Sequence, residues 1–197
     1  MKESIGIIGA GSIGQTVAKY FANAGYEVIL SNSKAPESLS SIVKAIGGNT
    51  RAELVAEAAQ ADIVVLALPW SQINVIPSLT NWDNKLVIDA MNAYSPDFQP
   101  LDLGTQRSSE IIAGYVKGAS LVKMFNTLYF KILAEIPESD QGNRILFFAG
   151  DDAAAKQKVS EIITTFGFAG VDIGDLFASK IQEPNQPLSG LNTLKVK

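Results

Sequence analysis

The sequence of 197 residues contains neither cysteine nor histidine, and each absence excludes a class of chemistry. Without cysteine there is no disulfide framework, no thiolate metal site and no cysteine nucleophile. Without histidine there is no imidazole metal ligand and no Ser-His-Asp triad. Charged residues make up only 18% of the chain, and Asp and Glu nowhere cluster at the spacing of a carboxylate metal site. We therefore expect no metal centre.

Long hydrophobic runs are also missing. The longest run, Ile63–Leu68 with its alanine neighbours, is far shorter than the roughly 20 residues that cross a bilayer. Met1–Ser4 leads into glycine-punctuated sequence, which is not the apolar segment of a secretion signal. The net charge of −4 lacks the basic excess that nucleic-acid binding needs. We expect a cytoplasmic protein that acts on a small molecule and binds neither membranes nor nucleic acid.

The apolar residues that are present form short runs of strand length. Hydrophobic residues make up 47% of the chain. The short runs look apolar on both faces, a pattern that is typical of a parallel sheet covered by helices on both sides. The predicted strands are Ser4–Ile8, Glu27–Leu30, Ile63–Leu68, Lys85–Ile88, Leu121–Met124, Ile145–Ala149 and Gly170–Ile173. Helical patterns separate them, at Ile13–Ala24, Pro36–Ile46, Ala52–Gln60, Trp70–Leu79, Glu110–Lys117, Leu128–Ile136 and Asp152–Phe166. This alternation predicts an α/β fold with a single doubly wound (Rossmann) parallel sheet and helices on both faces.

Two segments depart from the alternation. Tyr94–Ser109 carries two prolines and several polar residues, so we expect a long surface loop. Beyond Ser179 neither helical nor strand periodicity continues. We therefore predict a dinucleotide-binding domain over residues 1–180 and an irregular C-terminal tail over 181–197 that packs on the domain or on a partner. Because an open sheet leaves its edges unpaired, we expect a homodimer.

A glycine-rich loop follows the first predicted strand with the spacing GxGxxG. Gly9 permits a sharp turn, Gly11 lets a pyrophosphate approach the backbone, and Gly14 lets the helix pack closely on the strand. The helix start offers N–H groups and a positive dipole end to the anion. A tight turn alone explains one glycine but not three in register. We therefore predict a dinucleotide site formed by Gly9, Ala10, Gly11, Ser12, Ile13 and Gly14.

The end of the second predicted strand indicates which dinucleotide binds. An NAD site usually has Asp or Glu there, but this chain has no carboxylate before Glu37, and Glu27 lies at the opposite edge of the sheet. The residues present suit a 2′-phosphate, with an ammonium group for charge: Ser31, Asn32, Ser33 and Lys34. We predict NADP(H) over NAD(H) by at least about tenfold, or about 1.4 kcal/mol. The alternative interpretation is a polar loop in which Ser33 caps the next helix.

Other polar and aromatic residues follow the later strands, where doubly wound sheets bind their ligands. We predict that the nicotinamide half of the cofactor is bordered by Leu68, Pro69, Trp70, Met91 and Asn92, with Asn92 as the hydrogen-bonding residue. An aromatic residue that opens a helix is also a common core residue, so Trp70 has a second interpretation. Asp89 is most simply a turn-fixing carboxylate.

A third strand end, with Asn126 and Thr127, is predicted to face the redox partner, although Thr127 is also placed to cap the next helix. We predict no catalytic acid or base, since histidine is absent and no Tyr-x-x-x-Lys pair lies on a predicted helix. Hydride exchange between nicotinamide and a second flat ring needs mainly alignment, distance and exclusion of water. The chain fits that reaction better than it fits carbonyl reduction.

Taken together, these motifs resemble the NADP oxidoreductase family typified by the deazaflavin (coenzyme F420)-dependent enzymes, and within it the uncharacterised bacterial dinucleotide-binding members. The segments that carry the resemblance are Gly6–Val28, Ser31–Lys34, Leu66–Trp70, Val87–Asn92, Val122–Thr127 and Phe148–Asp152. The resemblance implies that residues 9–14 hold the pyrophosphate and residues 31–34 the 2′-phosphate. It also implies that Asn126, Thr127 and Phe130 contact the second redox ring.

The leading hypothesis is therefore an NADP(H)-dependent oxidoreductase that passes hydride to or from a deazaflavin or flavin. Two alternatives stay open at this point. One is an imine reductase of the pyrroline-5-carboxylate reductase type, and the other is a redox sensor that binds NADPH without turnover.

Overall fold

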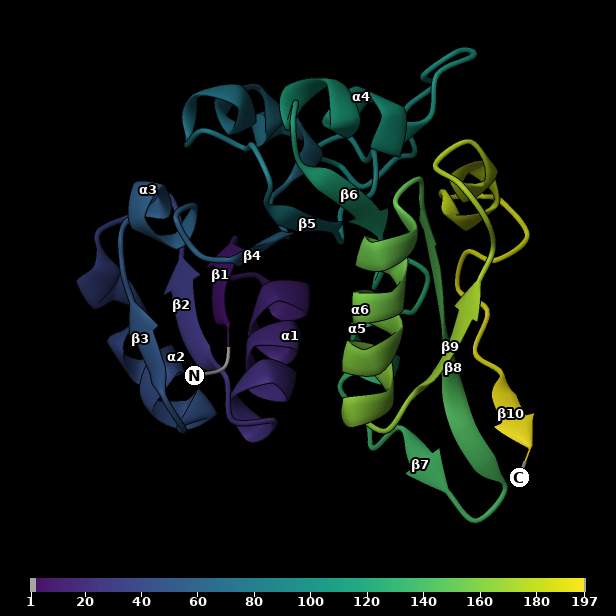
Figure 1. The fold of residues 1–197 in the computed structure, drawn as a ribbon, viewed down its shortest axis with the longest axis horizontal. Helices are drawn as coiled ribbons and strands as arrows, with labels where there is room; N and C mark the ends of the chain where they lie inside the picture. Colours follow the sequence, from purple (N-terminus) through teal and green to yellow (C-terminus); the bar gives the residue numbers. More distant parts are fainter. Residues whose placement is uncertain (1–2, 197) are drawn as a thin grey trace.

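A computed structural model describes residues 3–196, whose sheet has the strand order β10-β8-β6-β5-β4-β1-β2-β3 (Figure 1). Six neighbouring strands in this order are parallel. They are β1 (Ser4–Ile8), β2 (Glu27–Ser31), β3 (Thr50–Ala52), β4 (Ile63–Leu66), β5 (Leu86–Asp89) and β6 (Ser120–Lys123). The order 3-2-1-4-5-6 is that of dinucleotide-binding sheets, so the predicted Rossmann class is confirmed.

The remaining strands are not part of a purely parallel sheet, and that detail of the prediction was wrong. β8 (Gly142–Gly150) runs antiparallel to β6, because it follows β7 in a hairpin that reverses the direction of the chain. β9 (Ala169–Asp172) is parallel to β8, whereas β7 (Glu138–Ser139) and β10 (Leu194–Val196) are antiparallel to it. Buried strands of either direction show the same apolar runs, so the sequence pattern did not distinguish them.

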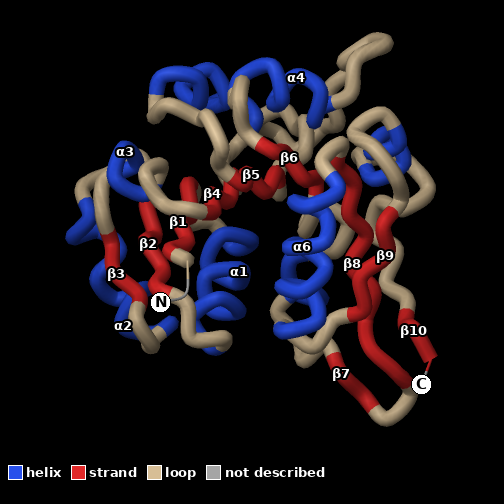
Figure 2. The backbone as a smooth tube through the Cα atoms, in the orientation of Figure 1, coloured by secondary structure: helices blue, strands red, loops and turns tan. Residues whose placement is uncertain are grey.

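Helices cover both faces of the sheet, as predicted. One face packs against α1 (Ser12–Asn23), α2 (Ser40–Ile46), α5 (Phe130–Leu133) and α6 (Ala153–Thr165). The other face packs against α3 (Val55–Ala58), the 3-10 helix η2 (Trp70–Ser78) and α4 (Ser108–Tyr115). In Figures 1 and 2 the sheet curves around α1 and α6. Within residues 3–196, none of the helices is at once long and apolar enough to pass through a bilayer.

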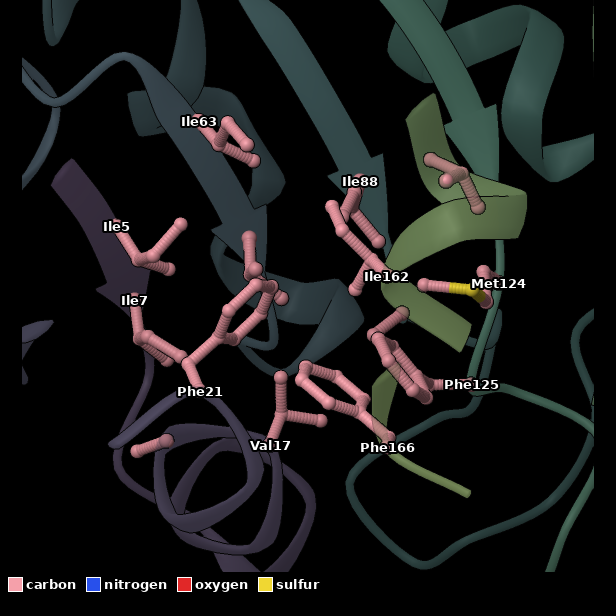
Figure 3. Packing of buried hydrophobic residues seen from close by; sticks show 14 of the residues in the cluster. Ile5, Ile7, Val17, Phe21, Ile63, Ile88, Met124, Phe125, Ile162 and Phe166 are labelled. Carbon is pink, nitrogen blue, oxygen red and sulfur yellow. The ribbon is translucent and has the colours of Figure 1, made fainter. Parts of the chain in front are cut away.

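The apolar runs alternate between these two layers. Ile63 and Val65 of β4 belong to the core beneath α1 and α6, whereas Val64 and Leu66 belong to the core beneath α3 and η2. Figure 3 shows the first core, in which Phe21 of α1 meets Phe166 beyond α6. Their rings are 4.9 Å apart and nearly perpendicular. Such an aromatic contact contributes about 0.5–1.5 kcal/mol beyond the buried area.

Several helices are shorter than predicted. Pro77 lacks an N–H, and the segment expected as a helix over Trp70–Leu79 forms 3-10 turns. The helix expected over Ala52–Gln60 is only Val55–Ala58, because the preceding residues form the short, polar strand β3. The tail beyond residue 180, expected to be irregular, contains the end of the 3-10 helix η3 (Ala178–Gln182) and β10, which pairs with β8.

Candidate functional site

The loop from β1 to α1 needs two of its three motif glycines for the fold itself. Gly9 has a φ of +114°, and a Cβ there would lie 2.3 Å from the carbonyl oxygen of Ala67. A Cβ at Gly14 would lie 1.9 Å from the carbonyl oxygen of Gly9. Real atoms cannot approach so closely, so both positions require glycine whether or not a ligand binds.

Gly11 differs from the other two glycines. Its φ of −74° is open to any residue, and a Cβ would meet no protein atom within 4 Å. Neither the backbone nor the packing of the chain therefore requires glycine here. A ligand that approaches the backbone does require it, and that is the role of the second glycine in a pyrophosphate loop.

The start of α1 is suited to an anion. No side chain caps this helix at Gly11, and its first turn contains no acidic residue. Ser12 is exposed, while Ala10 and Ile13 are half-buried and pack against the core. The positive end of the helix dipole and the N–H groups of the first turn together favour a phosphate group at this end. The residues from Gly9 to Gly14 thus fit a dinucleotide pyrophosphate.

Ser31, the last residue of β2, does not line the surface as predicted. Its side chain is fully buried, and its hydroxyl donates to the carbonyl oxygen of Ile7 at 2.9 Å. The hydroxyl therefore ties β2 to β1, because the strand continues one residue further than expected and turns this side chain inward.

The next three residues form the exposed part of the loop. The Asn32 side chain accepts a hydrogen bond from the backbone N–H of Lys34 at 2.8 Å, which closes an Asx turn. Ser33 and Lys34 are exposed, and no carboxylate between residues 3 and 196 forms an ion pair with Lys34. The following 3-10 helix begins at Pro36 without a side-chain cap, so Ser33 does not cap it. Lys34 is thus a free cation at the end of β2.

The carboxylates near β2 are engaged elsewhere. Glu27 begins β2 at the opposite edge of the sheet, as predicted, and pairs with Arg51. Glu53 reaches the same edge as Lys34, but its carboxylate lies 3.3 Å from the Arg51 guanidinium. A hydrogen bond with Glu53 also raises the pKa of the neighbouring Glu57. Glu27 and Glu53 thus share the Arg51 guanidinium as their cationic partner.

Ser31→Ala is expected to cost about 1 kcal/mol of stability through the lost hydrogen bond, which lowers Tm by about 2–4 °C. The ratio of NADPH to NADH affinity should stay unchanged, because the hydroxyl faces Ile7. Thermal unfolding and dinucleotide titration measure the two effects, with the exposed Ser33→Ala as the control for stability. A selective loss of NADPH affinity in Ser31→Ala would restore the original prediction for this hydroxyl.

The carboxyl ends of β5 and β6 bring Asn92 and Asn126 together. The Asn92 amide donates to the backbone carbonyl of Asn126 at 2.8 Å, and the Asn126 amide donates to the Asn92 side chain at 3.1 Å. The Asn126 amide also donates to the backbone carbonyl of Gln182 in η3, at 2.9 Å. Gln182 was missed by sequence analysis, because the tail around it shows no periodicity.

A buried ion pair lies behind these amides. Lys123 and Asp89 are both fully buried, and the Lys123 ammonium lies 3.0 Å from the Asp89 carboxylate. The ammonium also donates to the carbonyl oxygen of Met91 and to the Ser108 hydroxyl. Asp89 accepts from the backbone N–H of Met91 at 2.9 Å, which confirms its turn-fixing role. The pair therefore fixes the turn that carries Met91 and Asn92.

Lys123 was also missed as a site residue, although the sequence contained a signal for it. Lys123 and Asp89 are opposite charges at the ends of strands that proved to be neighbours, and they are partners in the β5–β6 register. A lysine within an apolar run needs a partner, because an unpaired buried charge is costly.

The other predicted residues are spread along the same edge. Leu68, Trp70 and Met91 are buried in the core under η2, which supports the core interpretation of Trp70, and Pro69 is exposed. Thr127 is buried beside Asn126, and its hydroxyl has no partner, so it does not cap a helix. Phe130 is half-buried against the ring of Tyr129. Phe125, just before Asn126, is buried with a φ of +68°, a strained conformation of the kind found at functional sites.

Comparison with known proteins identifies the family. The chain is 41% identical to the hypothetical protein SMa0349 of Sinorhizobium meliloti, over 98% of this chain and 96% of that one, with a TM-score of 0.92. Residues 4–93 match the family model described as NADP oxidoreductase, coenzyme F420-dependent. The part of the chain from β1 to just beyond β5 thus matches this family. The resemblance found in the motifs is confirmed, and with it the class of NADP-dependent oxidoreductase. The family match supports NADP(H) as the dinucleotide.

More distant proteins share the architecture of this chain. A proposed F420-dependent NADP reductase of Arthrobacter sp. FB24 is 21% identical, with a TM-score of 0.76, over 91% of this chain and 87% of that one. The metalloreductase STEAP3 of Rattus norvegicus is 25% identical over 178 residues, which are 89% of this chain. The chain spans only 35% of that relative's length. An imine reductase of Myxococcus stipitatus shares the fold at 21% identity, and there the chain covers 55% of the neighbour, with a TM-score of 0.61.

Proposed function

We propose that this protein transfers hydride between NADP(H) and a flat redox acceptor of the deazaflavin or flavin type. The observation that carries the proposal is the chemistry at the ends of β5 and β6. Carboxamides and a hydroxyl lie there, and the charged pair Lys123–Asp89 is buried and satisfied by its own contacts. Reduction of a carbonyl needs a proton donor within reach, whereas hydride exchange between two rings does not.

Each part of the site has a role in this proposal. Residues 9–14 hold the pyrophosphate, and Asn32, Ser33 and Lys34 hold the 2′-phosphate. Leu68, Pro69, Met91 and Asn92 border the nicotinamide half, while Asn126, Thr127 and Phe130 face the acceptor ring. Bound NADPH supplies the hydride, and the chain's own residues orient the two rings and keep water away from them.

The test measures NADPH oxidation with a panel of acceptors under anaerobic conditions. We expect turnover with a deazaflavin or a flavin, and loss of that turnover in a variant that cannot bind the dinucleotide. Tight NADPH binding without turnover of any deazaflavin, flavin, quinone or ferric acceptor would overturn the proposal in favour of a redox sensor.

Lys34→Glu is expected to weaken NADPH binding at least about tenfold, or about 1.4 kcal/mol, because it places a carboxylate against the 2′-phosphate. NADH binding should change little, since NADH lacks that phosphate. Lys44→Glu makes the same charge change in the last turn of α2, and serves as the control. Equal losses for both dinucleotides in Lys34→Glu would contradict the 2′-phosphate assignment.

The homodimer also stays a prediction. β3 and β10 lie at the two ends of the main strand order, so their outer edges are open to pairing with a second copy. Light scattering at several protein concentrations measures the molar mass and so tests for the dimer.

A further inference from the structure

Three carboxamide side chains form a chain across the carboxyl ends of β5 and β6, and a backbone carbonyl orients each of them. Asn92 donates to the carbonyl of Asn126 at 2.8 Å, Asn126 to that of Gln182 at 2.9 Å, and Gln182 to that of Phe147 at 3.0 Å. A carbonyl oxygen only accepts hydrogen bonds. Each NH₂ group must therefore face its carbonyl, which fixes the direction of every amide oxygen.

The amide oxygens are satisfied in turn along the chain until its last member. The Asn92 oxygen accepts from Asn126 at 3.1 Å, and the Asn126 oxygen accepts from Gln182 at 3.4 Å. The Gln182 oxygen has no hydrogen-bond partner in the described part of the chain, although the residue is fully buried. The Thr127 hydroxyl, beside Asn126 in sequence, is also buried and unpartnered. Buried polar atoms are rarely left without a hydrogen bond. Within residues 3–196 four buried side-chain atoms lack one, and those of Gln182 and Thr127 are the two that belong to this amide chain or directly follow one of its residues.

The chemistry of the two free atoms limits what a ligand presents to them. An amide oxygen only accepts, whereas a hydroxyl donates or accepts. One ligand group that would satisfy both atoms is a neutral edge that carries an N–H and a C=O. The carboxamide of nicotinamide has such an edge, and so does the imide of a flavin or deazaflavin ring. A quinone offers carbonyl oxygens without an N–H.

We propose that Gln182 is a specificity-determining residue that, together with Thr127, recognises this amide or imide edge. The proposal rests on the proposed function, because that function places a ring at the ends of β5 and β6. It adds a residue outside the matched segment 4–93, and it predicts which acceptors the site favours.

The surrounding contacts hold Gln182 in position. The Ser179 and Ser109 hydroxyls share a hydrogen bond, Glu183 accepts from the backbone N–H of Ser108, and Gly190 donates to the carbonyl of Thr127 at 2.7 Å. The Glu183 carboxylate is paired with Lys180 at 2.8 Å. Because both free atoms are buried, contact with a ligand ring requires this segment to shift.

The experiment pairs two variants with two matched pairs of ligands. Gln182→Met keeps the length of the side chain and removes the acceptor oxygen. Thr127→Val keeps the shape and removes a hydroxyl that has no partner among residues 3–196, so it should fold normally. The first ligand pair is NADPH and its acetylpyridine analogue, which lacks the amide N–H. The second is riboflavin and N3-methylriboflavin, which lacks the imide N–H.

We expect the wild-type protein to bind one of the two ligands about tenfold more weakly, or by about 1.4 kcal/mol, when its N–H is removed. The affinity of Gln182→Met should fall no more than twofold for the same change of ligand. The ligand pair that responds tells whether the edge belongs to nicotinamide or to the acceptor. Thr127→Val should bind the unmodified compound of that same pair more weakly than the wild-type protein does.

Equal discrimination in wild-type protein and Gln182→Met, for both ligand pairs, would overturn the proposal. Binding is measured by fluorescence without turnover, so the result is separate from the test of hydride transfer. If the proposed function fails, NADPH is not oxidised with any acceptor. The ratio of the affinities for NADPH and its acetylpyridine analogue, compared between wild-type protein and Gln182→Met, still tests the role of Gln182.

Discussion

Gly11→Ala is expected to weaken the binding of NADPH and of NADH by the same factor, at least about tenfold. Its Tm should change by less than about 4 °C. A methyl group at this position meets no protein atom, so it occupies only the space toward the backbone that a pyrophosphate approaches. Because both dinucleotides share the pyrophosphate, both should be affected. The small stability cost expected is that of alanine replacing glycine at a helix N-cap.

Gly14→Ala is the matched comparison and should behave in the opposite way. Its Cβ would lie 1.9 Å from the carbonyl oxygen of Gly9, so the helix must move away from the strand. Overpacking typically costs about 1–3 kcal/mol. A clash with a backbone oxygen belongs at the upper end, about 3 kcal/mol, which lowers Tm by roughly 6–12 °C. Thermal unfolding followed by dinucleotide titration separates the two variants. A Gly11→Ala protein that binds NADPH as tightly as wild type would remove the basis for a pyrophosphate at this loop.

Lys123→Met is expected to destabilise the protein by about 3–5 kcal/mol, the usual result of removing one partner of a buried ion pair. Asp89 would remain fully buried without its cation, and the carbonyl of Met91 and the Ser108 hydroxyl would lose a donor. The turn that carries Asn92 would lose its support, so NADPH binding at the temperature of measurement should also weaken. Denaturant unfolding measures the free energy directly.

The double variant Lys123→Met with Asp89→Asn is the control for this effect. It removes both charges, and the amide oxygen introduced at position 89 can still accept from the Met91 N–H. We expect most of the lost stability to return, since replacing a whole buried pair is often nearly neutral. If the double variant is as unstable as Lys123→Met alone, the cost comes from the lost contacts of Lys123 rather than from an unpaired charge.

Local patterns in the sequence predicted much of the fold. Strands that are apolar on both faces, such as Ile63–Leu66, predicted a sheet covered on both sides, and the glycines of the first loop predicted the β1–α1 turn. These features are local because each depends on the side chains of one short segment. Asp89 was predicted correctly for the same reason, since its hydrogen-bond partner is only two residues away.

Contacts between segments that are distant in the sequence could not be predicted from such local patterns. The direction of β8, the inward turn of Ser31 and the amide chain from Asn92 to Gln182 all depend on what lies beside a residue in space. Gln182 is 56 residues from Asn126, and no pattern in the tail marks it.

By itself the sequence determined the βα alternation, the glycine loop and the class of dinucleotide site, because steric needs of the backbone and apolar periodicity are written in consecutive residues. Only the tertiary structure decided that Gly11 is free of packing constraints, that Lys123 is neutralised by Asp89, and that the Gln182 oxygen and the Thr127 hydroxyl lie unpartnered beside Asn126. Burial and hydrogen-bond satisfaction depend on neighbours that the folded chain alone assembles.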